Sequence, residues 1–323
     1  MKDNKPLKGI PLERWEVFLR ALGNRVSAPS EALPTVRCWK HSVLSGEIKA
    51  VIKENRSALL TTFPPAYQVI EHLKRMGWAQ PIKAQSPGGS QPIEFLLVDT
   101  GSEEGPPISP LELLEAWLPT GTICYFSALT HYELTTQIAA YHHIARLNPQ
   151  RPRKEPTELI EPNKESQAVE RNPLGTEIFR FTEVSYYETR RDASLVPGIQ
   201  MRVASPKTWL RITTLEQTLL DTLLQPVRCG GEAVILEAWE NGLKEMDADR
   251  MADHLSKIQR DDLERRVAAV LDIIGANVGA TALGRRLQEL RQRLGSSQEI
   301  PEIPLLPGFQ FANFSETWKV RTP

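Results

Sequence analysis

The amino-acid sequence predicts an α+β protein with about two domains. Three observations support this class. Helical spacing of apolar residues dominates residues 11 to 75, alternating apolar residues typical of strands fill residues 176 to 211, and helical spacing returns from 213 to 295. The chain has 323 residues, of which 41% are hydrophobic, and this is enough to bury a substantial core.

The first hundred residues are predicted to form three helices followed by two strands. Helices are expected at 11 to 22, at 44 to 55 and from 66 until Gly77 ends the third, and strands are expected at 78 to 85 and 91 to 99 around a turn at 86 to 90. Residues 24 to 42 show no sustained period, and 57 to 63 is expected to be a short strand. Helix, helix, helix, hairpin is the order of a winged helix. Residues 1 to 99 are therefore predicted to be a winged-helix-like DNA-binding module.

In a winged helix, the helix before the hairpin enters the major groove of DNA. We expect its solvent face, together with Lys83 near the wing, to carry the DNA contacts. These residues are Tyr67, Gln68, His72, Lys74, Arg75 and Lys83. The alternative is that this is an ordinary solvated helix face, since the acidic Glu71 also lies on it. A further alternative is that the module only joins domains.

The distribution of charge supports two modules with different partners. Residues 1 to 99 carry 14 Lys and Arg against 9 Asp and Glu, whereas the remainder carries 25 against 31. A basic N-terminal part is typical of a module that binds phosphate groups. The alternative is that the solvent-exposed charges are distributed this way by chance. No segment is apolar for long enough to span a membrane, so a cytoplasmic location is expected.

The second domain is expected over residues 108 to 295, after a polar, Gly/Pro-rich linker at 100 to 107. A polar stretch at 148 to 172 is expected to be a surface insertion, and the strands are followed by a C-terminal helical bundle. In that bundle, Thr213 and Glu216 are expected to form a capping box for a helix that buries Leu219 and Leu220. The tail at 296 to 323 is rich in proline and aromatic residues. Docking on the chain's own body is expected, with a partner groove as the second interpretation.

Three segments of the second domain resemble the AbiEi family, the antitoxin side of type IV toxin–antitoxin systems. They are GTICYFSALTHYELTTQIAAYHHIAR at 121 to 146, ITTLEQTLLDTLLQPVRCGGEAVILEAW at 212 to 239, and the helical run from Leu263 to Gly275. At Glu133-Leu134 the chain departs from the family, which usually has a glycine there. The resemblance implies an AbiEi-like α/β domain that counters or senses a nucleotidyltransferase-type toxin.

No motif with catalytic or metal-binding chemistry is expected to be functional, and neither an enzyme nor a cofactor is predicted. Glu216 and Asp221 lie five residues apart on one helix, but a cap and a contact with backbone or arginine explain them better than catalysis. His142 and His143 are adjacent, so in a strand they point to opposite faces and cannot chelate one metal together. No Asp-x-Asp pair follows Gly101-Ser102, which excludes a nucleotidyltransferase.

Pairs of arginines stand out in the acidic back half. Guanidinium groups recognise carboxylates and phosphates, so these pairs are candidate contacts for a toxin or another subunit. The candidates are Arg190, Arg191, Arg265, Arg266, Arg285 and Arg286. The alternative is that each pair neutralises nearby acidic residues of its own chain.

Together these features predict an AbiEi-like antitoxin and transcriptional regulator that binds double-stranded DNA of its own promoter. The alternative is a non-catalytic accessory or scaffold subunit of a phage-defence or nucleic-acid-processing complex.

Overall fold

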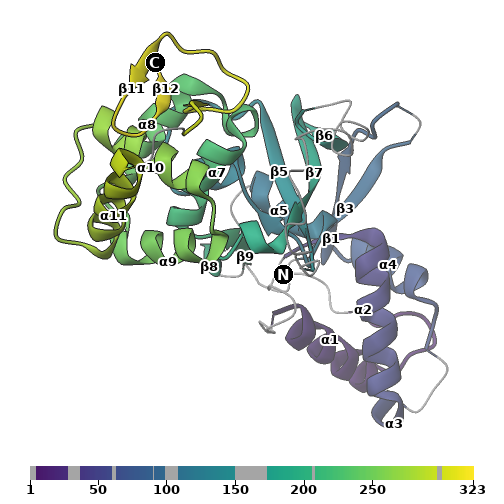
Figure 1. Cartoon of the computed structure of the whole chain (residues 1–323). Coiled ribbons are helices and arrows are strands. Elements are labelled where there is room, and N and C mark those ends of the chain that lie inside the picture. Colours follow the sequence, from purple (N-terminus) through teal and green to yellow (C-terminus); the bar gives the residue numbers. More distant parts are fainter. Residues whose placement is uncertain are drawn as a thin grey trace. The chain divides into compact units, whose positions relative to one another are not determined.

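The protein is an α+β protein in the computed structural model (Figure 1). The structure describes residues 5–27, 37–59, 63–89, 91–98, 108–149, 173–205, 208–296 and 300–323. Within these ranges there are eleven α-helices and twelve β-strands, and none of the helices is long and apolar enough to cross a membrane. The predicted linker at 100 to 107 lies outside the described residues, as does most of the predicted insertion at 148 to 172.

The chain divides into two compact units, each built from several segments. The first unit comprises Met1–Gly121, Ile178–Tyr186 and Met201–Arg211, and the second comprises Thr122–Glu177, Tyr187–Gln200 and Ile212–Pro323. The sequence alone had placed the boundary at residues 100 to 107. In the structure, the helix that follows this stretch belongs to the first unit, together with two strand segments from much later in the chain.

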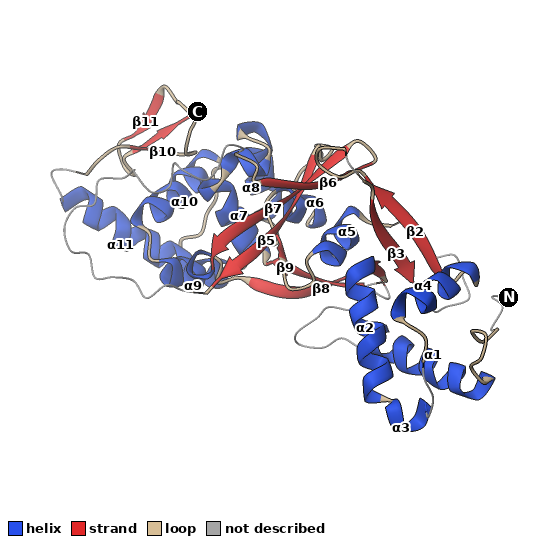
Figure 2. Cartoon of the chain, turned by 90° about the vertical axis from the view of Figure 1, so that its right-hand side faces the viewer, coloured by secondary structure: helices blue, strands red, loops and turns tan. Residues whose placement is uncertain are grey.

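The first unit begins with the predicted helices and hairpin. In order these are α1 (Leu12–Ser27), β1 (Cys38–Lys40), α2 (His41–Glu54), α3 (Arg56–Leu59), α4 (Ala66–Arg75), β2 (Ala79–Ala84) and β3 (Ile93–Val98). The strands form an antiparallel sheet in the order β1-β3-β2, drawn in red in Figure 2. The helices pack through Trp15, Phe18, Leu44, Ile48 and Ile70, all of which are buried.

One prediction for this region was wrong, and one strand was not predicted. The strand expected at 57 to 63 is the short helix α3 as far as Leu59, and β1 lies in the stretch that shows no period. β1 is only three residues long, too short to show alternation, and it forms because Trp39 pairs with Leu96 of β3.

Helix α5 (Pro110–Trp117) completes the first unit and begins with a capping box between Ser109 and Glu112. Glu112 has two further partners in this unit. Its carboxylate accepts a hydrogen bond from Arg37 Nε at 2.7 Å and another from Thr208 Oγ1 at 2.8 Å. The capping carboxylate thus also connects α5 to the residue before β1 and to a strand from much later in the chain.

A six-stranded sheet has the order β6-β7-β5-β4-β9-β8. Its strands are β4 (Thr122–Ile123), β5 (Tyr141–Asn148), β6 (Thr176–Phe181), β7 (Val184–Asp192), β8 (Ile199–Ser205) and β9 (Thr208–Thr213). The alternating residues at 176 to 211 are therefore strands, as predicted. β4 pairs antiparallel with β5 and parallel with β9, through Ile123 opposite Ile212.

The helices of the second unit share one core. They are α6 (Phe126–His131), α7 (Leu215–Leu224), α8 (Glu232–Gly242), α9 (Ala248–Ile258), α10 (Asp261–Ile273) and α11 (Ala282–Ser296). Leu219 and Leu220 of α7 are fully buried in this core, as the periodicity predicted. The expected capping box is wrong, since α7 is capped by Thr214, whose Oγ1 accepts a hydrogen bond from Gln217 N.

The tail docks on the second unit, as expected. β10 (Ile303–Pro304), β11 (Asn313–Ser315) and β12 (Val320–Thr322) form a small sheet in the order β10-β12-β11, coloured yellow in Figure 1. Leu305, Leu306, Trp318 and Val320 are buried in the same core as α7 and α10. The Trp318 indole Nε1 also donates a hydrogen bond to the Asp272 carboxylate at 2.6 Å, so the polar group of this buried side chain has a partner.

Candidate nucleic-acid interface

Helix α4 presents the surface for which the sequence predicts DNA contact. Its apolar residues at 66, 69, 70 and 73 are buried, so that the opposite side of the helix is left to solvent. Tyr67, Gln68 and Arg75 are exposed there, with 58% of Tyr67 accessible. Lys83 is exposed on β2 in the hairpin that follows. Four of the six predicted contact residues therefore face solvent.

His72 is not on that surface, and its predicted role in DNA contact is corrected. Its side chain is buried, its Nε2 lies 2.8 Å from the carbonyl oxygen of Lys5, and its ring meets the edge of Trp15. His72 is three residues after the buried Val69, so it lies at the border of the apolar stripe. Spacing alone could not decide on which side of that border it falls.

Lys74 is held by carboxylates of its own chain. Its Nζ is 2.9 Å from Glu71 Oε1 and 3.0 Å from Glu94 Oε1, and these hydrogen bonds raise the pKa of the ammonium group. Two carboxylates around one ammonium leave this part of the surface with a net negative charge. Arg75 is different, because in the part of the chain that the structure describes its Nε donates to a backbone carbonyl, that of Glu71, at 3.3 Å.

An open hollow of about 410 Å³ lies at the start of α2, lined by Lys40, His41, Ser42, Ile93 and Glu94. The first turn of α2 contains no acidic residue, and the side chain of its N-cap residue, Lys40, makes no capping hydrogen bond. Such a helix start favours anions. No sequence pattern indicates this hollow, because Lys40 is not a typical capping residue and the helix is expected to begin at Leu44.

Three of the six predicted partner-binding arginines are buried, and their predicted role is corrected. Arg191 donates to both oxygens of Asp221, at 2.6 and 2.5 Å, and its guanidinium lies 4.7 Å from the centre of the Tyr125 ring. Arg265 donates to carbonyl oxygens of the tail, including that of Trp318 at 2.8 Å, and Arg266 to that of Pro304. These arginines hold their own chain together.

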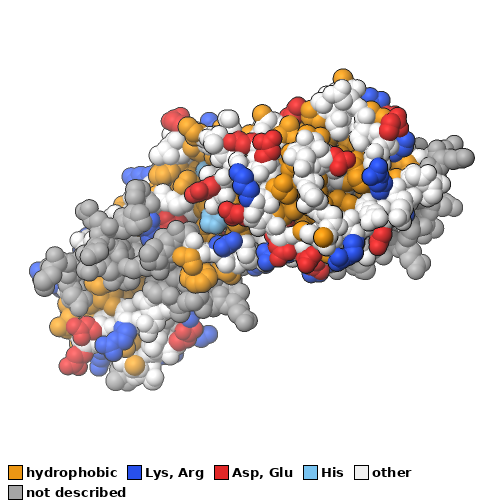
Figure 3. Space-filling view, turned by 90° about the vertical axis from the view of Figure 1, so that its left-hand side faces the viewer, with side chains coloured by type: hydrophobic (Ala, Val, Ile, Leu, Met, Phe, Trp, Pro, Cys, Tyr) orange, Lys and Arg blue, Asp and Glu red, His pale blue; other side chains and the backbone are white. Residues whose placement is uncertain are grey.

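The other three arginines are more accessible. Arg190 and Arg285 are exposed, whereas Arg286 is half-buried and pairs with Glu264. On the face of the molecule drawn in Figure 3, basic and acidic side chains are interspersed and do not gather by sign. No broad basic surface for a partner is visible on that face.

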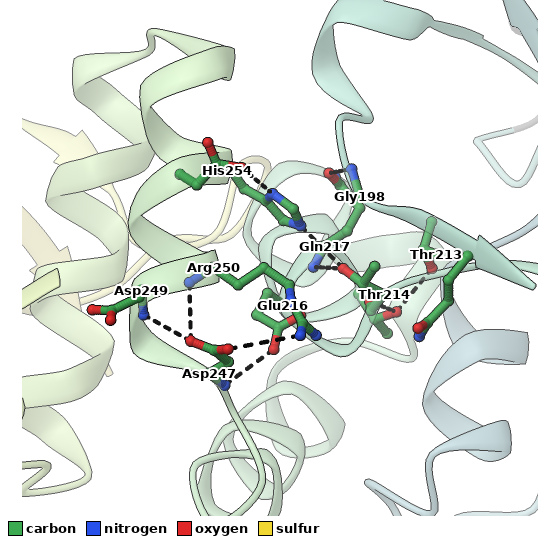
Figure 4. A network of polar contacts seen from close by, with 12 residues as sticks. Gly198, Thr213, Thr214, Glu216, Gln217, Asp247, Asp249, Arg250 and His254 are labelled. Atoms are coloured by element: carbon green, nitrogen blue, oxygen red, sulfur yellow. Dashed lines mark hydrogen bonds and ion pairs between the residues drawn. The ribbon is translucent and has the colours of Figure 1, made fainter. Parts of the chain in front are cut away.

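The carboxylates weighed for catalysis have structural roles. Glu216 accepts hydrogen bonds from Asp247 N at 3.0 Å and from Arg250, as Figure 4 shows, and so joins the start of α9 to α7. In the same network, His254 Nε2 lies 3.1 Å from Thr214 Oγ1, and burial lowers the pKa of His254. Asp221 is the partner of Arg191, which agrees with the expected contact to an arginine.

His142 and His143 are both buried, and burial lowers the pKa of His142 to about 4 and that of His143 to about 3. His142 Nδ1 lies 3.3 Å from Ser127 Oγ, whereas His143 Nε2 lies 2.9 Å from the carbonyl oxygen of Leu174. Among the described residues, no group of three or more His, Cys, Asp or Glu could hold a metal ion.

Comparison with known proteins adds a distant similarity. No protein-family model and no curated protein matches the chain. Among solved structures, the RV2827C protein from Mycobacterium tuberculosis is similar over 99% of this chain and 92% of its own, with 15% sequence identity and a TM-score of 0.48. A similarity at this level carries no functional argument, which therefore depends on the residues described above.

Proposed function

We propose that the chain is an AbiEi-like antitoxin and transcriptional regulator. In this proposal the N-terminal part of the first unit is a winged helix that binds double-stranded DNA of its own promoter. The second unit counters or senses a nucleotidyltransferase-type toxin. The observation that carries the proposal is the element order α1, β1, α2, α3, α4, β2, β3 with the sheet order β1-β3-β2, which supports a winged helix with one additional short helix, α3.

The exposed side of α4 is suited to the major groove. Gln68 can read adenine through two hydrogen bonds, and Arg75 can bind guanine or a phosphate. Lys83 on the hairpin and the N–H groups at the start of α2 are suited to the phosphate backbone. The proposal thus uses both base contacts and backbone contacts, as sequence-specific binding requires.

The antitoxin part of the proposal is supported by the resemblance of residues 121 to 146, 212 to 239 and 263 to 275 to the AbiEi family. The first two segments contain α6, β5, α7 and α8 of the second unit. The second candidate function, an accessory or scaffold subunit, is favoured by one observation. Glu71 and Glu94 neutralise Lys74 and place negative charge beside α4, where DNA would be repelled.

Binding of a labelled duplex from the chain's own promoter, followed by fluorescence anisotropy at several salt concentrations, tests the DNA part. Arg75→Ala should weaken binding to every duplex and lower the salt slope by about 1. Gln68→Ala should cost about 1 to 3 kcal/mol with the promoter duplex only. Glu94→Gln should strengthen binding, because it removes a negative charge and releases Lys74.

Arg285→Ala is the matched control, since it removes an exposed arginine from the second unit and should leave DNA binding unchanged. Equal affinities and salt slopes for the wild type and Arg75→Ala would contradict the proposed interface and favour the accessory subunit. The toxin part is tested separately. It predicts a nucleotidyltransferase-type gene beside the gene for this chain, and co-expression of the chain should neutralise the toxicity of its product.

A further inference from the structure

The hairpin of β8 and β9 carries most of the net positive charge of the first unit. Within this unit, residues 1 to 121 have 14 Lys and Arg against 13 Asp and Glu, and residues 178 to 186 have one of each kind. Residues 201 to 211 have three basic residues and no acidic one, so the hairpin supplies +3 of a net charge of +4. The sequence contains no acidic residue between Asp192 and Glu216.

The same hairpin, labelled in Figure 2, exposes three large apolar side chains. Met201 and Val203 of β8 are 40% and 52% exposed, and Trp209 of β9 is 37% exposed. Met201 and Val203 are two residues apart in one strand, so they lie on the same side of it. Single exposed apolar side chains are common, but three within nine residues of a basic hairpin indicate a binding surface.

Trp209 and Arg211 point to the same side of β9. Thr208, Leu210 and Ile212 alternate with them and are buried, whereas Trp209 is exposed and Arg211 is half-buried. An indole ring next to a guanidinium group on one side of a strand offers a surface for a nucleobase beside a charge for a phosphate.

Two carboxylates hydrogen-bond to this hairpin, and both are buried. Glu112 accepts a hydrogen bond from Thr208 Oγ1 at 2.8 Å, and Glu115 accepts one from the backbone N of Arg211 at 2.8 Å. Both belong to α5, and Glu112 also forms an ion pair with Arg37. These carboxylates therefore add no negative charge to the exposed surface of the hairpin.

We propose that the β8–β9 hairpin binds single-stranded nucleic acid. An unpaired base stacks on Trp209, and Arg211 together with Arg202, an exposed residue of β8, binds the phosphates. Proteins that bind single strands combine basic groups along the backbone with aromatic side chains on which bases stack. The bases of a duplex are already paired and stacked on one another, so an exposed indole cannot use their faces. The proposal goes beyond the duplex interface proposed on α4 and does not depend on it.

Fluorescence anisotropy of labelled oligothymidylate and oligouridylate of about 15 nucleotides, titrated with the full-length chain, tests the stacking contact. Trp209→Ala should weaken binding at least fivefold, because it removes the surface for one base. Trp209→Phe should retain most of the affinity, because an aromatic ring remains. Tyr67→Ala, at an exposed aromatic residue of α4, is the matched control and should leave binding of both oligonucleotides unchanged.

Arg202→Gln tests the phosphate contact without changing the tryptophan. It should lower the salt slope of oligothymidylate binding by about 0.7, the value for one phosphate of a single strand. Arg75→Ala removes an exposed arginine from α4 and should leave this slope unchanged. Thermal denaturation like that of the wild type shows that each variant is folded.

The proposal is wrong if the wild type binds neither oligonucleotide at low salt, or if Trp209→Ala and Arg202→Gln both bind like the wild type. A loss in Trp209→Ala that Trp209→Phe does not restore would also overturn it. If the oligonucleotide results are as expected but the promoter duplex does not bind, only the interface on α4 is wrong.

A benzophenone amino acid in place of Val203 distinguishes nucleic acid from a protein strand added at the edge of the sheet. In cells that express the full-length chain, the group should cross-link to RNA or to single-stranded DNA, and nuclease digestion identifies which. Cross-linking only to a protein would overturn the proposal.

Discussion

At the scale of single residues, burial distinguishes charged side chains that stabilise the fold from charged side chains that a partner can reach. Arg191 and Asp221 form a buried pair that is completed by Gln217, whose Nε2 donates to Asp221 Oδ1 at 2.8 Å. Removing one partner of such a pair costs about 3 to 5 kcal/mol, because the other charge remains buried. Arg190, its neighbour in the strand, points to solvent. Two adjacent arginines of identical chemistry therefore have different roles.

The carboxyl group of Glu115 in α5 lacks a complete set of partners. Oε1 accepts a hydrogen bond from Arg211 N at 2.8 Å, whereas the buried Oε2 has no partner among the described residues, and burial raises the pKa of this group well above 4.5. The folded state therefore keeps a proton that the unfolded chain releases. Stability conferred by this group is present below the unfolded pKa and is lost as the pH rises through the folded pKa.

Glu115→Gln should remove this pH dependence, because an amide has no proton to release and still offers one oxygen to Arg211 N. Urea denaturation at pH values from about 5 to 8 measures it. The free energy of unfolding of the variant should rise relative to the wild type as the pH increases. Glu240→Gln, at an exposed carboxylate, is the control. A constant difference between Glu115→Gln and the wild type would contradict the buried, protonated carboxyl.

At the scale of elements, short local contacts fix the connections between helices and strands. Glu133, the residue that follows α6 and its cap, adopts φ +55°, a left-handed conformation that glycine favours. Glu237 of α8 then accepts hydrogen bonds from Thr135 and Thr136, two and three residues further on.

The C-terminal tail depends on one buried guanidinium of α10. Arg265 donates to the carbonyl oxygens of Pro301, Trp318 and Lys319, which lie in different segments of the tail. Arg265→Ala should destabilise the tail by at least one charge-assisted hydrogen bond, about 1.5 to 3 kcal/mol. Hydrogen exchange should increase across residues 300 to 323. Arg285→Ala, at an exposed arginine of α11, should leave the exchange unchanged, and equal protection in both variants would contradict the role of Arg265.

At the scale of the whole molecule, the first unit is assembled from segments far apart in sequence. Residues 178 to 186 and 201 to 211 belong to it together with residues 1 to 121. Within this unit, the ring of Phe95 lies 5.1 Å from that of Phe179, and Phe179 stacks on Tyr186 at 4.4 Å. A cut near residue 105 therefore divides a core and does not separate two modules.

A fragment of residues 105 to 323 should consequently be less stable than the full chain. It retains Phe179 and Tyr186 but loses Phe95, and loss of a buried phenylalanine costs about 3 to 5 kcal/mol. Thermal denaturation should show a lower midpoint or aggregation for the fragment, whereas full-length Arg75→Ala should melt like the wild type. A fragment with the midpoint of the full chain would show that the first unit is not needed for its later strands.

The sequence by itself determined the α+β class, the long helices and the hairpin. These elements follow from local spacing, because an apolar stripe needs only residues three or four apart. The burial of Leu219 and Leu220 and the docking of the tail were also predicted correctly. In the candidate interface, the outward direction of Tyr67, Gln68 and Arg75 followed from the same spacing.

The tertiary structure alone decided which charged groups remain available. Lys74 is neutralised in part by Glu94, twenty residues away, and Arg191 by Asp221, thirty residues away. Arg265 is buried because the tail returns to α10 across more than thirty residues. Such pairs depend on distant segments meeting in space, and helical or strand spacing carries no information about that. The boundary between the units was decided in the same way, by the segments Ile178–Tyr186 and Met201–Arg211, which join the unit that comprises Met1–Gly121.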